Sequence, residues 1–361
     1  MRLCQESAFQ QGDYHHLDIG TTAKTLPPGC GDREKGDSDM FEKVREAAKR
    51  LEGIAHKTPV MTSTLLNERI GNQLFLKCEN FQRTGAFKIR GAYNAIFLLS
   101  PEAKKKGVIT FSSGNHGMAT ALTGRLLNVK VTVVMPADAP AVKMSATKGY
   151  GATVITYDRL TGSREEIAKE LVGKHGYTLV PPFDSEDIIA GQGTAAKELI
   201  ESVGELDYVF VPCGGGGLLS GSAISARHLL PSCRVIGVEP EMADDATRSF
   251  KSGKLQSIGT TDTVADGLRT PMLGNITFPL IRKYVDDMVT VSEQEIISTM
   301  YYLWARLKIV VEPSGAVSLA AIFHKKLPVT GKKAGFILSG GNVDVRTAPE
   351  LFAGVIGADM V

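Results

Sequence analysis

Four consecutive glycines are the feature of this 361-residue chain best suited to binding an anion. Gly214, Gly215, Gly216 and Gly217 follow an apolar run and precede a helical pattern. Because glycine has no Cβ, successive backbone N–H groups can converge on one ligand, and the N-terminus of the next helix adds partial positive charge. A tight turn needs only one or two glycines. The run of four therefore favours a phosphate cradle over a simple turn.

A second group of polar residues follows an apolar run at 107–111. It reads Ser112-Ser113-Gly114-Asn115-His116 and precedes another helical pattern. Hydroxyl, amide and helix N-terminal N–H groups together suit a carboxylate. Helix capping alone needs one such side chain, and here several lie between glycines. We therefore predict a carboxylate site, with ordinary capping as the alternative.

Lys88 lies among small and apolar residues in the segment Thr84-Gly85-Ala86-Phe87-Lys88-Ile89-Arg90-Gly91-Ala92. A lone lysine is normally a solvated surface charge. A desolvated lysine at the start of a helix has a lowered pKa and becomes a nucleophilic amine. A reactive lysine combined with a phosphate cradle is what pyridoxal phosphate requires, so the two features together predict a site for that cofactor.

The elements that must position these residues alternate between strands and helices from residue 74 onward. Such alternation predicts an α/β fold with mostly parallel sheets covered by helices, and ligands in such folds bind beyond the carboxyl ends of the strands. The expected strands are 74–78, 107–111, 131–135, 153–157, 208–213, 234–239, 287–291 and 335–339. The expected helices include 117–127, 164–175, 191–203, 218–230 and 293–307.

Composition argues against several classes of protein. The net charge is only +2, which gives no reason to expect a nucleic-acid or membrane partner. The five cysteines show no CxxC spacing, so we expect neither a zinc site nor a disulfide framework, and a reducing cytoplasm is the default location. Residues 1–39 have no apolar signal region, and we expect a disordered extension there, followed by an amphipathic helix at 40–53. An ordered arm that covers a neighbouring subunit is the alternative.

The order of these blocks resembles the fold type II pyridoxal-phosphate enzymes, in the branch of the serine racemases and serine/threonine dehydratases. The resemblance runs from about residue 41 to 344. It implies two lobes, with a large cofactor-binding domain at 41–106 and 185–350 and a small domain at 107–184. The matching blocks are Phe87-Lys88-Ile89-Arg90-Gly91-Ala92, Ser112-Ser113-Gly114-Asn115-His116, Ala190-Gly191-Gln192-Gly193-Thr194, the four glycines, Ala265-Asp266-Gly267 and Ser339-Gly340-Gly341-Asn342.

The resemblance also implies a role for each site residue. Lys88 would form the Schiff base and move the Cα proton, and Ser113 would be the acid/base on the opposite face. The cofactor would lie beside Phe87 and would contact Asn115, Ser339 and Gly214 to Gly217. The substrate carboxylate would be held by Ser112, Ser113, Asn115 and His116.

A metal site is implied by the same resemblance in the segment Glu239-Pro240-Glu241-Met242-Ala243-Asp244-Asp245. Glu239, the carbonyl of Ala243 and Asp245 would bind Mg²⁺ or Ca²⁺, since hard cations prefer oxygen ligands. An acidic solvated turn is the alternative.

We therefore expect a lyase that removes water and ammonia from L-serine, L-threonine or a related β-hydroxy amino acid, with possible isomerase activity as a serine racemase. Its partner would be a small amino acid, and the chain would form a homodimer or a higher homo-oligomer. One alternative is a nucleotide-dependent oxidoreductase, although no GxGxxG register fits the glycine run. A phosphate-binding protein without catalysis is the other.

Overall fold

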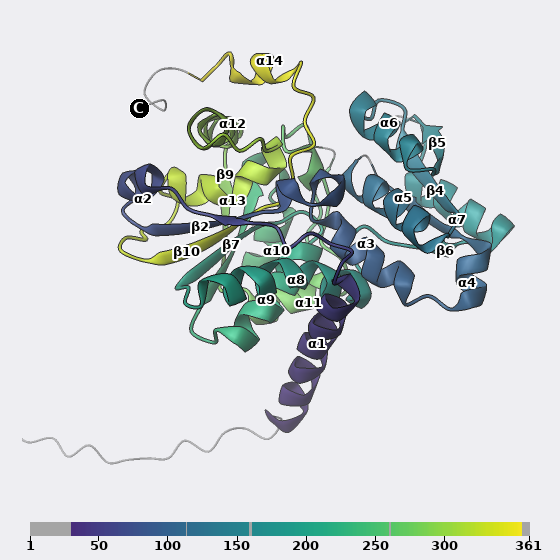
Figure 1. The fold of residues 1–361 in the computed structure, drawn as a ribbon, viewed down its shortest axis with the longest axis horizontal. Helices are drawn as coiled ribbons and strands as arrows, with labels where there is room; N and C mark the ends of the chain where they lie inside the picture. Colours follow the sequence, from purple (N-terminus) through teal and green to yellow (C-terminus); the bar gives the residue numbers. More distant parts are fainter. Residues whose placement is uncertain (1–29, 113, 159–160, 260, 356–361) are drawn as a thin grey trace, which may run out of the picture.

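The computed structural model describes residues 30–112, 114–158, 161–259 and 261–355, so Ser113 lies outside the described residues. Two sheets organise the chain (Figure 1). The larger sheet has six strands in the order β1-β2-β10-β7-β8-β9. Every neighbouring pair in it is parallel except β1 with β2. Its strands are β1 (Val60–Met61), β2 (Gln73–Cys78), β7 (Tyr208–Pro212), β8 (Arg234–Pro240), β9 (Asp287–Val291) and β10 (Lys333–Leu338).

The smaller sheet has four strands, all parallel, in the order β5-β4-β3-β6. It is formed by one continuous part of the chain and lies to one side of the larger sheet (Figure 1). Its strands are β3 (Val108–Phe111), β4 (Val131–Pro136), β5 (Thr153–Tyr157) and β6 (Thr178–Leu179).

Helices cover both faces of both sheets, as parallel strands require. The helices are α1 (Cys30–Leu51), α2 (Thr64–Ile70), α3 (Lys88–Phe97), α4 (Pro101–Lys106), α5 (Asn115–Leu127), α6 (Ala141–Gly149), α7 (Arg164–His175), α8 (Glu186–Val203), α9 (Gly217–Leu229), α10 (Asp245–Ser252), α11 (Thr277–Tyr284), α12 (Glu293–Tyr302), α13 (Pro313–Phe323) and α14 (Ala348–Phe352). No helix in the described part of the chain is both long enough and apolar enough to span a membrane.

Strand β7 shows why its sequence is a continuous apolar run. Val209 and Val211 belong to a core that also contains α1, α8 and α9, whereas Phe210 belongs to the core on the other face, with α12 and α13. Successive side chains of a strand point to opposite faces, so a sheet covered on both faces needs apolar residues at every position. The expected α/β fold with mostly parallel, helix-covered sheets is confirmed.

The observed elements differ from the expected ones at several boundaries. The short strands β1 and β6 were not expected, because two residues carry no periodic pattern. The helix expected at 293–307 ends at Tyr302 and continues as a π-helical segment, Leu303–Leu307. The helix expected at 117–127 begins at Asn115, so Asn115 and His116 lie in its first turn.

Helix α1 begins at Cys30, ten residues before the expected start at Met40. The apolar periodicity begins only near Met40, and Val44 and Ala47 are fully buried in the core. A helix can extend beyond its packed part through backbone hydrogen bonds alone, and hydrophobic periodicity gives no signal for such a segment. Residues 1–29, where disorder was expected, lie outside the described part of the chain.

Candidate active site

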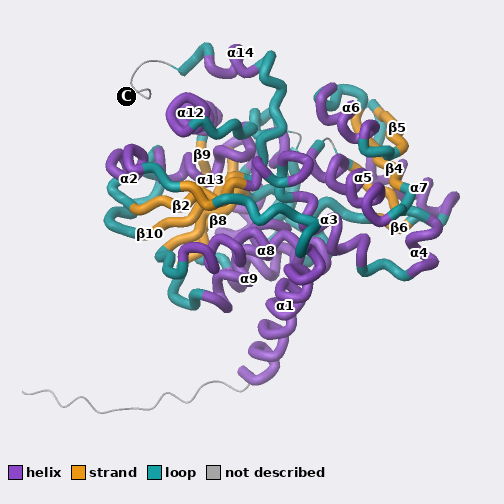
Figure 2. Tube along the Cα trace, viewed as in Figure 1, coloured by secondary structure: helices purple, strands orange, loops and turns teal. Residues whose placement is uncertain are grey.

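A pocket between the two sheets contains most of the residues singled out from the sequence. Its lining residues follow the carboxyl ends of β3, β7 and β10, where the loops of parallel α/β sheets place their ligands. Figure 2 shows strands β4, β5 and β6 of the smaller sheet lying apart from strands β2, β8 and β10 of the larger sheet. The singled-out residues that line it are Phe87, Lys88, Ser112, Asn115, His116, Gly214, Gly215, Gly216, Gly217 and Ser339.

The glycine run connects the end of β7 to the start of α9. Gly216 has a φ of 88°, and a Cβ there would approach Ile281 Cδ1 to 2.8 Å, so only glycine fits without strain. A Cβ on Gly215 would overlap the ring of Phe183. Within the described residues, no protein acceptor is found for the backbone amides of these four glycines. The amides and the N-terminus of α9 therefore fit a phosphate group.

Lys88 is the first residue of α3 and faces this pocket. Its Nζ donates a hydrogen bond to the carbonyl of Pro182 at 2.8 Å and lies 5.2 Å from the centre of the Phe87 ring. No carboxylate pairs with it among the described residues. Desolvation in the pocket lowers the pKa of its amine to about 8. A solvated surface lysine is thus ruled out, and the amine fits a cofactor aldehyde.

The segment after β3 brings Ser112, Asn115 and His116 to the pocket wall. The N-cap of α5 is Gly114, whose N–H donates to Ser112 Oγ at 3.1 Å. His116 is buried, with Nε2 3.3 Å from the carbonyl of Val180, and no described residue hydrogen-bonds to its Nδ1. Burial, followed by the positive charge of Lys88, lowers the pKa of His116 to about 3, so its imidazole is neutral near pH 7.

Ser339 follows β10 and lines the pocket. It is buried, and its Oγ donates to the carbonyl of Ser314 at 3.2 Å. Its own carbonyl accepts from the Phe87 N–H at 3.1 Å, which ties the end of β10 to the residue before Lys88. The lone pairs of Oγ remain available to a ring nitrogen that carries a proton.

An ion cluster in the pocket was not predicted from the sequence. Lys143 Nζ, on α6, lies 2.6 Å from Asp266 Oδ2 and 3.2 Å from Glu312 Oε2. The other oxygen of Glu312 accepts from Asn115 Nδ2 at 2.5 Å. Although burial opposes ionisation of Lys143, the two carboxylates raise its pKa above the usual value. Glu312 directly precedes α13, and no motif in the sequence marks it as a residue of the pocket.

Two further residues of the pocket, Arg164 and Phe183, were not assigned to the site from the sequence. Arg164, at the start of α7, lines the pocket; its Cζ lies 5.1 Å from the centre of the Phe111 ring, and it pairs with exposed Glu165. Phe183 packs against the glycine loop. Since such contacts depend on how distant segments fold together, spacing along the chain could not identify these residues.

The expected metal loop lies at the end of β8, away from this pocket. Glu239 is fully buried and accepts from the Ala246 and Thr247 N–H groups at 3.2 and 2.7 Å. Burial, and then the charge of Asp245, raise the pKa of Glu239 well above its usual value. Asp245 is 1% exposed, its Oδ2 has no hydrogen-bond partner among the described residues, and burial raises its pKa to about 7.

Two adjacent buried carboxyl groups and an unpartnered oxygen fit a cation. A positive charge would offset the repulsion between the two carboxylates and the free-energy cost of burying them away from water. Among the described residues, however, no group of three or more His, Cys, Asp or Glu side chains is arranged to hold a metal. The set proposed from the sequence needs only two such side chains, together with the carbonyl of buried Ala243.

Comparison with known proteins identifies the class of this chain. It belongs to the family described as "Pyridoxal-phosphate dependent enzyme", whose model matches residues 51–340. Pyridoxal phosphate is therefore its cofactor, and the chain is an enzyme. This membership contradicts both alternatives, the nucleotide-dependent oxidoreductase and the non-catalytic binding protein.

The individual relatives are similar over nearly their whole length. An L-threo-3-hydroxyaspartate ammonia-lyase of Saccharomyces cerevisiae is 54% identical over 311 residues, which cover 86% of this chain and 95% of the relative. A serine racemase of Schizosaccharomyces pombe is 50% identical over 305 residues, covering 84% and 94% of the two chains. The crystal structure of serine racemase from Dictyostelium discoideum has a TM-score of 0.80 at 48% identity and covers 84% of this chain and 99% of that chain.

Proposed function

We propose that the protein eliminates water and ammonia from a small L-β-hydroxy amino acid to give an α-keto acid, with serine racemisation as a second activity. The observation that carries the proposal is the desolvated amine of Lys88, which has no carboxylate partner among the described residues and lines the same pocket as the glycine loop. The names of the relatives support a β-hydroxy substrate, since they include hydroxyaspartate ammonia-lyases and serine racemases.

The cofactor, when bound, withdraws electrons from the bond between Cα and its hydrogen. In our proposal the amides of Gly214 to Gly217 would hold its phosphate and Phe87 would lie beside its ring. Asn115 would hydrogen-bond to its 3-hydroxyl group, and Ser339 would face its ring nitrogen. The neutral amine of Lys88 takes the Cα proton, and its pKa of about 8 leaves part of the population able to do so near pH 7.

The remaining residues of the proposed site orient the substrate. Ser112, Ser113, Asn115, His116 and the N-terminus of α5 hold its carboxylate, so that the Cα hydrogen points to Lys88. Loss of the β-hydroxyl as water gives an enamine, which hydrolyses to the α-keto acid and ammonia. Arg164 adds a cation to the pocket wall and is placed to accept a second carboxylate, which is why 3-hydroxyaspartate belongs among the candidate substrates.

Racemisation is the second candidate function because one relative that is 50% identical carries the name serine racemase. It requires proton transfer on both faces of Cα. We assign proton transfer on the face opposite Lys88 to Ser113, because of its residue type and its place between Ser112 and Gly114. Ser113 itself lies outside the described residues.

We further propose that Glu239, Asp245 and the Ala243 carbonyl bind Mg²⁺ or Ca²⁺. The buried, unpartnered Asp245 Oδ2 supports this assignment. A metal there would stabilise the turn between β8 and α10, at a distance from the chemistry.

We propose a homodimer or higher homo-oligomer, located in the cytoplasm. Exposed Phe81 and Val310 support association, because they lie close together, as shown by a 3.0 Å hydrogen bond from Asn80 Nδ2 to the Val310 carbonyl. Within the part of the chain that the structure describes, Cys78, Cys213 and Cys233 form no disulfide, which fits a reducing compartment. We also propose domain boundaries at 107 and 184, since all four strands of the smaller sheet lie between them.

An assay of α-keto acid and ammonia tests the proposed activity. The panel contains the D- and L-isomers of serine, threonine and 3-hydroxyaspartate, with chiral analysis of the remaining substrate. Equal amounts of keto acid and ammonia from at least one L-isomer are expected, and Lys88→Ala serves as the control that loses them. No keto acid from any member of the panel would overturn the proposal.

A further inference from the structure

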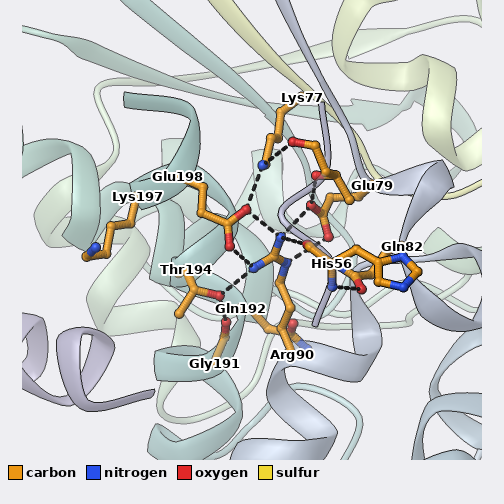
Figure 3. Close-up of polar contacts among 12 residues, drawn as sticks. His56, Lys77, Glu79, Gln82, Arg90, Gly191, Gln192, Thr194, Lys197 and Glu198 are labelled. Carbon is orange, nitrogen blue, oxygen red and sulfur yellow. Dashed lines mark hydrogen bonds and ion pairs between the residues drawn. The ribbon is translucent and has the colours of Figure 1, made fainter. Parts of the chain in front are cut away.

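Arg90 lies two residues after Lys88 and is completely buried (Figure 3). Its Nε donates to Glu79 Oε2 at 2.8 Å, and Nη2 donates to Glu79 Oε1 at 2.8 Å. Nη1 and Nη2 donate to the two carboxylate oxygens of Glu198 at 2.7 and 2.8 Å. The guanidinium is thus held by two carboxylates, each through two hydrogen bonds, which fixes its orientation as well as its position.

The ion cluster around Arg90 contains two cations and two carboxylates, so its net charge is zero. Lys77 Nζ lies 2.6 Å from Glu198 Oε2 and donates to the Thr58 carbonyl at 2.8 Å. Lys77 and Arg90 therefore balance Glu79 and Glu198. These residues come from β2, the turn after it, α3 and α8, so the cluster joins the start of α3 to the larger sheet and to α8.

Lys88 and Arg90 point away from one another across the first turn of α3. Two residues correspond to a rotation of about 200° around a helix, so an inward guanidinium places the lysine on the pocket side. The start of α3 has no side-chain cap hydrogen bond at Phe87. Its backbone also packs closely on α8, where a Cβ on Gly191 would lie 2.5 Å from the Arg90 carbonyl oxygen.

We propose that Arg90 is a positioning residue for Lys88: by locking the rotation of the first turn of α3, it aims the amine at the cofactor. This inference rests on the proposed role of Lys88. Stability alone is a weak explanation for the cluster, because buried ion pairs often contribute little compared with apolar residues of similar volume. A fixed guanidinium does, however, specify one rotation of the helix, which an apolar side chain in the same space would not.

The test compares Arg90→Met with Lys77→Met. Both substitutions remove one buried cation from the same cluster, but only Arg90 lies on α3. We expect both to lower the melting temperature. Only Arg90→Met should change the circular dichroism of the lysine-bound cofactor, slow the attachment of pyridoxal phosphate to the apoenzyme, and lower kcat by about 10²-fold with a smaller change in KM.

Arg90→Lys keeps the positive charge and covers the case in which Arg90→Met does not fold. A lysine cannot hold two carboxylates through paired hydrogen bonds, so the orientation should loosen while the charge balance remains. The dichroism of this variant should therefore also differ from that of the wild type, whereas a purely structural role predicts an unchanged signal.

Equal changes in Arg90→Met and Lys77→Met, or a wild-type dichroism and attachment rate in Arg90→Lys, would overturn the inference. Dichroism and attachment rate are measured without substrate. They therefore separate a failure of this inference from a failure of the proposed elimination activity, which would appear only in the keto-acid assay of the wild type.

Discussion

Lys143 Nζ lies 2.6 Å from Asp266 Oδ2 and thereby connects the two sheets of the molecule across the pocket. Lys143 is on α6, which packs on the smaller sheet. Asp266 begins the short 3-10 helix Asp266–Leu268, and its neighbours Ala265 and Leu268 lie in a core of the larger sheet. The side chains are 4% and 25% exposed, so water screens their attraction only in part. Glu312 completes the cluster and holds Asn115.

Lys143→Ala should therefore weaken both the fold and substrate binding. It leaves the buried Glu312 carboxylate without its cation, and removing one partner of a buried pair costs about 3–5 kcal/mol. We expect a lower melting temperature and a higher KM, measured by thermal unfolding and steady-state kinetics. The double variant Lys143→Met/Glu312→Gln is the control, because it removes both charges. If the double variant is no more stable than Lys143→Ala, the loss of the ion pair is not the cause of the lower melting temperature.

Attachment of the cofactor to Lys88 should depend on pH with a midpoint near 8. Desolvation lowers the pKa of the amine from 10.5 to about 8, and only the neutral amine attacks an aldehyde. Between pH 6 and 8 the rate should rise about tenfold per pH unit, and above pH 8 it should level off. Stopped-flow absorbance of apoenzyme mixed with pyridoxal phosphate measures this rate. A midpoint above pH 10 would show that Lys88 is solvated.

The polar residues near the chain's glycines were predictable because they carry local signals. Gly214 to Gly217 and the segment from Ser112 to His116 each combine residue types that have few other uses at a strand-to-helix junction. The buried strands were predictable for the same reason, since a sheet covered on both faces needs continuous apolar runs.

The ion clusters were not predictable, because their members are far apart in the sequence. Lys143 and Glu312 are separated by 169 residues, and Arg90 and Glu198 by 108. Nothing near Lys143 distinguishes it from a solvated lysine, and only the packing of α6 against the rest of the pocket buries it. The start of α1 at Cys30 could not be predicted for a different reason: the sequence between Cys30 and Met40 has no apolar periodicity that would indicate a helix.

Ser113→Ala should separate racemisation from elimination. Removal of the hydroxyl should lower racemisation and elimination of the D-isomer by the roughly 10²–10⁴-fold typical of a general acid/base. Elimination of the L-isomer should fall less, because it depends on Lys88. Both rates are measured on both isomers of serine. Parallel losses in all of them would mean that Ser113 is not the acid/base on the face opposite Lys88.

A chelator should lower the melting temperature of the wild type but not that of Asp245→Ala. Without a cation, Glu239 and Asp245 are two buried acids in electrostatic contact, which destabilises the loop between β8 and α10. Differential scanning calorimetry with and without EDTA, followed by added Mg²⁺ or Ca²⁺, measures the effect. Asp244→Ala is a matched control on the neighbouring acid. A wild-type melting temperature that does not respond to EDTA would contradict the metal site.

The assignment of Lys88 as the attachment point of the cofactor is tested most directly by reduction of the holoenzyme with borohydride, followed by peptide mass spectrometry. Reduction converts the labile link between lysine and cofactor into a stable amine, so the modified residue can be read from the peptides. We expect a pyridoxyl group on Lys88 alone, since Lys77 and Lys143 are held by carboxylates. A pyridoxyl group on another lysine, with Lys88 unmodified, would contradict this assignment.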